Sequence, residues 1–181
     1  MSIQAHKPAT KGRQDSALEV FSICNAANLH LLKYVDPRAW RAPLPGFRHK
    51  TIASIFAHLH NCRLMWMKMT GKRAGLPPPL DRNTCTKQQV TAALNRSAAT
   101  LSTHIAAALA RGNGRITGFS LGAAAFACYL TTHEAHHRGQ IVMLTRQIGY
   151  PLPLDGRYGV WNWSKLAKSA RRITTQRSAK R

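Results

Sequence analysis

Three histidines crowd one short segment, where the chain reads HEAHH from His133 to His137. If the segment is helical, each residue turns by about 100°. His133 and His137 then face the same way and share their stripe with apolar residues such as Leu130 and Ile141, whereas His136 turns away. Two imidazoles one helical turn apart can bind one metal ion, which satisfies ring nitrogens that burial would otherwise leave without partners. The alternative is a pair of core histidines bonded to backbone or water.

A third ligand for such an ion must come from another helix, and the upstream segment IFAHLHNCRLMWM offers His58 and His60. Helical spacing does not choose between them. His58 shares a face with Cys62 and Met65, His60 shares one with Leu64, and the segment is apolar nearly all round. From spacing alone, either histidine could complete the site.

The HEAHH segment also satisfies HExxH, the zinc-peptidase motif in which two histidines bind zinc and the glutamate is the general base. A peptidase needs a third ligand, usually downstream, yet no histidine follows His137. A zinc hydrolase is therefore the less favoured reading. Glu134 could orient a ligand, act as a base on a metal-bound water or thiol, or face solvent beside Arg138. We favour solvent or a supporting structural role.

Long helices joined by loops are expected to position these residues. The third helix begins with a capping box, because Thr86 is followed three residues later by Gln89, and Gly71 and Gly149 end the second and fourth. The segment RITGFSLG before the fourth could be a short hairpin or a loop. Because convincing strand-like alternation is missing, the pattern predicts an all-α protein, an antiparallel four-helix bundle. The expected helices cover residues 17–34, 51–69, 86–110 and 121–148.

Charge and capping residues divide the chain into a flexible basic arm (1–14), the bundle (15–163) and a basic C-terminal tail (164–181). The first helix is expected to begin behind Asp15 and Ser16, which can cap backbone N–H groups. The net charge is +21, and about half of the excess lies near the two ends. Such a field attracts phosphate polymers. Because no signature of a dedicated nucleic-acid reader is present, we expect only nonspecific nucleic-acid binding through the tails.

Cysteine usage and hydropathy indicate the compartment. The four cysteines contain no CxxC pair, and the polar start of the chain lacks an apolar leader. We therefore expect free thiols and a cytoplasmic location. The longest run of small and apolar residues, 121–130, has about ten residues, whereas a membrane-spanning helix needs about 20. No membrane is expected as a partner.

Two helical motifs occur together in this chain. AHL at 57–59 is followed by Trp66, eight positions after His58, and HEAHHRGQI at 133–141 lies on a helix that ends in LTRQIG. The segment around Asn28 adds an NxxLL pattern. With these motifs, residues from about 17 to 160 resemble the DinB/YfiT-like (damage-inducible) family of bacterial four-helix-bundle metalloproteins.

This resemblance implies that His58, His133 and His137 form a histidine triad that binds a divalent metal ion, with His60 and His136 as near neighbours. Three imidazoles leave open coordination positions, as in catalytic sites. Zinc or nickel suits all-nitrogen ligation. Some members of the family look like metal-dependent transferases or isomerases that use a low-molecular-weight thiol.

The resemblance also bears on the neighbouring residues. Gln140 is a second catalytic candidate beside Glu134, and it could line the site or pack the helix end. Gly139 is expected to permit close helix approach. The family pattern does not require Cys62 as a ligand, so we read it as a small core residue, and we read Trp66 as core.

The resulting hypothesis is a metal-dependent thiol transferase-like activity on a small electrophile, which would be the small-molecule substrate. The alternative is a non-catalytic metal-binding stress-response protein with incidental nucleic-acid affinity. Members of the family often look like homodimers, so a homodimer is a further expectation.

Overall fold

The computed structural model describes residues 10–46, 50–111 and 113–178, with side chains described for 16–46, 50–111 and 113–171. Helices dominate, and the part of the chain described here contains no named strand; an isolated bridge joins Arg115 to Gly122 in the loop before α4. The all-α class is therefore confirmed. The elements are α1 (Thr10–Tyr34), α2 (Ile52–Met69), α3 (Lys87–Ala110), α4 (Ala123–Gln147), α5 (Leu154–Tyr158), the 3-10 turn η1 (Gly159–Trp161) and α6 (Trp163–Ser178).

Local sequence explains where α2 and α3 begin. Thr51 and Ser54 form a capping box at the start of α2, and Thr86 and Gln89 form the predicted one at the start of α3. In each, side chains satisfy backbone N–H groups that the first helical turn leaves without partners. The starts of these helices therefore follow from residues close in the sequence.

Glycine explains where α2 and α4 end. Gly71 has φ of 90° and Gly149 has φ of 79°, a left-handed conformation that costs glycine little. After each glycine the next N–H bonds back to the last helical turn, from Lys72 to Met67 at 2.8 Å and from Tyr150 to Thr145 at 2.9 Å. Both predicted ends are confirmed.

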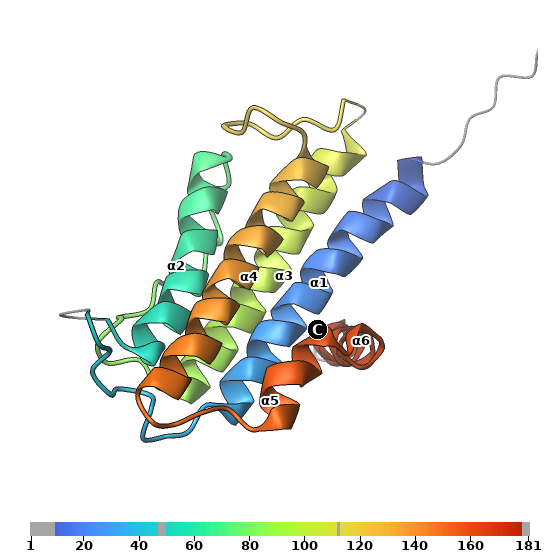
Figure 1. The fold of residues 1–181 in the computed structure, drawn as a ribbon. Helices are drawn as coiled ribbons and strands as arrows, with labels where there is room; N and C mark the ends of the chain where they lie inside the picture. Colours follow the sequence, from blue (N-terminus) through green and yellow to red (C-terminus); the bar gives the residue numbers. More distant parts are fainter. Residues whose placement is uncertain (1–9, 47–49, 112, 179–181) are drawn as a thin grey trace, which may run out of the picture.

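Contacts between helices give their directions. Arg63 on α2 bonds to Leu94 on α3, and Thr70 bonds to His104, so α2 and α3 run in the same direction. Figure 1 shows the same arrangement, with a crossover loop (residues 70–86) returning from the end of α2 to the start of α3. Only part of the bundle is antiparallel, because α2 and α4 run in opposite directions while α2 and α3 do not.

The interior has an apolar cluster on either side of a polar layer. One cluster includes Leu31, Phe56 and Leu94, and the other includes Phe21, Leu101 and Phe126. The layer between them is buried and consists of Asn25, Asn28, Arg63, Ser97 and Glu134. Because buried polar groups are costly unless they are hydrogen-bonded, these side chains must satisfy one another.

Both ends of the chain differ from the prediction. The first helix begins at Thr10, so Asp15 and Ser16 lie inside it and not at its start. The expected arm overlaps α1 at residues 10–14, and residues 1–9 lie outside the described part. The expected C-terminal tail is largely the helix α6, which packs on α1 through Leu166 against Ile23. The apolar face of α6 explains this packing. The sequence did not indicate it, because basic residues dominate the composition of this segment.

Within the described residues, none of the helices combines the length and the hydropathy needed to cross a bilayer.

Candidate metal centre

Three histidine rings converge between α2 and α4. The ring centroid of His58 lies 5.4 Å from that of His133 and 4.7 Å from that of His137. The centroids of His133 and His137, both on α4, are 4.6 Å apart. The two Nε2 atoms of His133 and His137 are separated by 3.2 Å. The structure thus brings together the three side chains singled out in the sequence, with His58 and His133 partly exposed to solvent.

Cys62 belongs to the same cluster. Its Sγ lies 3.4 Å from Nε2 and 3.5 Å from Nδ1 of His58. Donor atoms of His58, Cys62 and His133 all lie within 4.8 Å of one another, so these residues could hold a metal ion. The ring of His137 lies against both histidines of this group, with its centroid 4.7 Å from that of His58 and 4.6 Å from that of His133. The reading of Cys62 as a core residue is therefore wrong: its side chain is only partly buried and lies at the candidate site.

Gln140 orients the α4 histidines. Its Oε1 accepts a hydrogen bond of 2.9 Å from Nδ1 of His137, and its Nε2 donates one of 2.8 Å to Nε2 of His136. Because an amide oxygen can only accept, the proton of neutral His137 resides on Nδ1, which leaves the Nε2 lone pair available. Second partners of this kind fix ring orientation in metal sites. Gln140 is thus a positioning residue.

The three rings are held in their neutral form. Burial, with further contributions from His137 and Arg82, lowers the pKa of His58 to about 4. Burial also lowers the pKa values of His133 and His137. Neutral imidazole is the form that ligates a metal ion, so at pH 7 the cluster is in the protonation state that ligation requires.

The positively charged side chain of Arg82 lies at the edge of the histidine cluster. Nη2 of the exposed Arg82, in the crossover loop, donates a 3.0 Å hydrogen bond to Nδ1 of His58. This contact occupies one of the two ring nitrogens of His58 and, in the neutral ring, places its proton on Nε2. For Nε2 to ligate a metal ion, the ring must change tautomer and release Arg82.

Glu134 does not occupy the position expected of it. Its side chain is 1% exposed and receives hydrogen bonds from Arg63 Nε at 2.6 Å, Arg63 Nη2 at 2.8 Å and Asn28 Nδ2 at 2.6 Å. Burial alone would raise the pKa of Glu134, but the charge and hydrogen bonds of Arg63, together with the hydrogen bond from Asn28, outweigh burial and lower the pKa.

Two interpretations of Glu134 are therefore corrected. It does not face solvent, and it is not a catalytic base, because its oxygens are committed to Arg63 and Asn28. The HExxH reading loses its general base with it. The supporting structural role remains, and the partner is Arg63, a residue that the sequence analysis missed. The available signal was a lone arginine on an otherwise apolar face of α2, since a buried cation requires an anion.

Other residues of the two motifs serve packing. His60 is fully buried and its Nε2 lies 2.9 Å from the Pro78 carbonyl oxygen, so it contacts the crossover loop. Trp66 packs against Phe126, as expected of a core residue. Gly139 does not permit close helix approach, since a Cβ added there would meet nothing within 4 Å.

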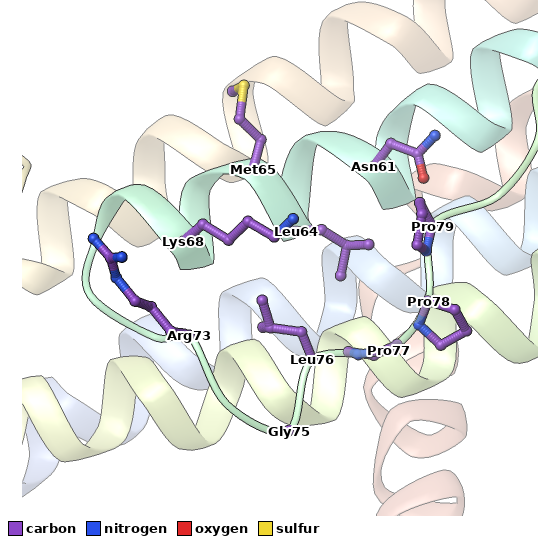
Figure 2. Close-up of a pocket in the computed structure, with 10 residues that line it drawn as sticks. All are labelled: Asn61, Leu64, Met65, Lys68, Arg73, Gly75, Leu76, Pro77, Pro78 and Pro79. Carbon is purple, nitrogen blue, oxygen red and sulfur yellow. The ribbon is translucent and has the colours of Figure 1, made fainter.

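A cavity of about 570 Å³ lies between α2 and the crossover loop, next to this region but separate from it. Figure 2 shows Lys68 and Arg73 on one side of it and the prolines 77–79 on the other. None of the clustered histidines lines this cavity.

The model of the family described as the DinB family matches residues 19–163. No curated protein and no solved structure matches the chain.

Proposed function

The chain belongs to the DinB family, and from this premise we propose that it binds a divalent metal ion through His58, His133 and His137 and has a thiol transferase-like activity on a small electrophile. The observation that carries the proposal is the convergence of three neutral rings from α2 and α4, with centroids 4.6–5.4 Å apart.

The residues present suit such an ion. Gln140 directs the free lone pair of His137 toward His133, and burial keeps the rings unprotonated. An all-imidazole set favours zinc or nickel among divalent ions. Cys62 could add a sulfur donor, which would also suit zinc.

Three ligands leave room for a small molecule, which distinguishes such sites from closed structural ones. A divalent ion there would act as a Lewis acid that favours the thiolate form of a thiol. In the proposed reaction the thiol loses its proton to water, its sulfur forms a bond to carbon of the electrophile, and the leaving group departs with the electron pair. The guanidinium of Arg82 favours negative charge at the edge of the cluster.

No protein base is required by this proposal, since Glu134 is committed to Arg63. The roles of the chain's own residues are binding and orientation: three histidines hold the centre, and Gln140 sets the tautomer of one of them. An alternative activity that uses Glu134 as a base would require it to leave a buried ion pair.

The test is consumption of a thiol by the metal-loaded protein. Zinc- or nickel-loaded protein is incubated with each of a panel of cellular thiols and chlorodinitrobenzene, and release of chloride and thioether is followed. We expect turnover with at least one thiol that is abolished in the His133→Ala/His137→Ala variant and kept in Cys128→Ser, because Cys128 is an exposed thiol outside the cluster. Silence across the panel and across other electrophiles would favour the non-catalytic metal-binding alternative.

A further inference from the structure

A groove of about 770 Å³ lies between α1, α4 and the C-terminal segment that contains α5, η1 and the start of α6. Its size falls within the range of about 300–1,000 Å³ that is typical of small-molecule sites. Figure 1 shows α5 and α6 beside the lower half of α1. The C-terminal segment therefore forms one wall of a cavity, in addition to covering α1.

The groove is separate from the histidine cluster. The residues of α4 that line it include Ala135, Gly139 and Val142. Ala135 follows His133 by two residues, which is about 200° around the helix. The groove and the histidine rings thus lie on opposite faces of α4.

Apolar and aromatic side chains make up most of the wall. Tyr158, Trp161 and Trp163 come from the C-terminal segment and are 62%, 75% and 50% exposed. Large aromatic side chains that remain exposed beside a cavity can cover an apolar ligand. The aliphatic lining residues include Ile23, Ala27, Leu31, Val142, Leu152 and Val160.

The charges in the wall are all positive. Arg138, Arg146 and Arg157 line the groove, and among its described lining residues there is no Asp or Glu. The buried carboxylate of Glu134, also on α4, is paired with Arg63. The wall therefore favours an anion.

Arg157 gives the most specific indication. Its Nε is buried and has no hydrogen-bond partner among the described residues, and its guanidinium lies 5.4 Å from the ring centroid of Tyr158. A buried donor without an acceptor is rare in native proteins. Guanidinium groups bind carboxylates with strong, directed hydrogen bonds.

We propose that this groove binds a small amphipathic carboxylate, with its apolar body against α1, α4 and the tryptophans and its carboxylate on Arg157. The site is independent of the metal proposal, because it uses the other face of α4. The apolar wall selects the body of the ligand, and the guanidinium of Arg157, whose Nε has no acceptor among the described residues, selects its head group.

Isothermal titration calorimetry of the full chain with dodecanoate, kept below the critical micelle concentration of dodecanoate, tests this proposal. We expect saturable binding of one equivalent per chain, with a change in tryptophan fluorescence. Dodecanol, which has the same tail without the charge, should bind roughly tenfold more weakly or worse, as expected for loss of a hydrogen bond between charged groups. Arg157→Gln should cause a similar loss, whereas Arg96→Gln, an exposed arginine on α3 outside the groove, should not.

A second variant fills the groove without disturbing the core. Gly139 has open space around it, so Gly139→Leu should fold normally and block dodecanoate, whereas Ala124→Leu, at an exposed position of α4 outside the groove, should bind it like the unaltered chain. The metal-site variant His133→Ala/His137→Ala should retain dodecanoate binding. That result separates this proposal from the proposed function.

Three results would overturn the proposal. These are equal affinity for dodecanol and dodecanoate, unchanged affinity in both Arg157→Gln and Gly139→Leu, and affinity that falls as protein concentration rises. The last result would indicate that a second copy of the chain covers the groove.

Discussion

The Arg63 guanidinium and the Glu134 carboxylate meet at 2.6 Å in the interior, where they join α2 to α4. Arg63 lies five residues after His58, and Glu134 directly follows His133. The pair therefore ties the two helices together close to the point where His58 meets His133 and His137. The same arginine bonds to Asn25 Oδ1 on α1 at 2.9 Å and to the Leu94 carbonyl on α3 at 3.0 Å, so it links all four long helices at this level.

Glu134→Gln should destabilise the protein strongly. The substitution leaves the Arg63 charge buried without its anion, a loss that typically costs about 3–5 kcal/mol. Urea denaturation followed by circular dichroism measures the change. The control is Glu19→Gln, which breaks the exposed ion pair between Glu19 and Arg171. This substitution should lower the free energy of unfolding by about 1 kcal/mol or less.

The ion pair can be distinguished from simple packing at this position. If Glu134→Gln and Glu19→Gln lower the free energy of unfolding equally, the buried charge of Arg63 is not stabilised by the Glu134 carboxylate. A double variant, Arg63→Met/Glu134→Met, should be more stable than Glu134→Gln, because no buried charge remains.

Features set by neighbours in the sequence could be predicted. The capping residues Thr51 and Thr86, and the glycines at 71 and 149, act within one helical turn, so the starts of α2 and α3 and the ends of α2 and α4 follow from local chemistry. The one-turn spacing of His133 and His137 likewise predicted that the two rings would lie together, and they do.

Features set by partners on other helices could not be predicted in the same way. Glu134 is one residue from a candidate ligand, but its surroundings are decided by Arg63, 71 positions away in the chain. Spacing left His58 and His60 equivalent, and the family resemblance chose His58. The fold gives the physical reason: His58 faces α4, whereas His60 meets Pro78. The packing of α6 on α1 was hidden because its basic residues outnumber the few apolar residues that make the contact.

Cys62 should occupy the fourth coordination position in the cobalt-substituted protein when no substrate thiol is present, and the substrate thiol would replace it there. Its Sγ lies 3.4 Å from a His58 nitrogen, and cobalt bound by a thiolate shows a charge-transfer band in the near ultraviolet. We expect that band in the unaltered chain and in Cys128→Ser, and its loss in Cys62→Ser. If the band is missing from all three proteins, or persists in Cys62→Ser, the thiol does not contact the metal.

Arg82→Gln should tighten metal binding. Arg82 donates to His58 Nδ1, and its charge helps to lower the pKa of His58. The same charge opposes a second cation at this ring, so its removal should raise affinity by roughly tenfold at low salt. Competition with a chromogenic zinc chelator measures this, with Arg73→Gln as the control. Weaker binding in Arg82→Gln would mean that Arg82 supports the site.

The metal-free protein should lose stability as pH falls from about 7 toward 4. The pKa of His58 is lowered to about 4 in the folded chain, while an unperturbed histidine in the unfolded chain titrates near 6.5. Between these values the unfolded chain binds more protons, so stability rises with pH in this window and is lost as pH falls through it. His133 and His137 shift in the same direction.

Urea midpoints measured between pH 4 and 7 in the presence of a chelator test this prediction. The His133→Ala/His137→Ala variant should show a shallower dependence on pH over the same window. It should not become flat, because burial also lowers the pKa values of His60 and His104. An identical dependence in the two proteins would show that the α4 histidines titrate alike in the folded and unfolded chains.

Direct elemental analysis of the purified protein tests whether His58, His133 and His137 bind one divalent ion. Equal amounts of the unaltered chain, His133→Ala/His137→Ala and the exposed-site control His136→Ala are loaded with zinc, desalted and measured by mass spectrometry. We predict close to one equivalent in the unaltered chain and in His136→Ala, and almost none in the double variant. Equal metal in all three proteins would mean that His133 and His137 do not bind the ion.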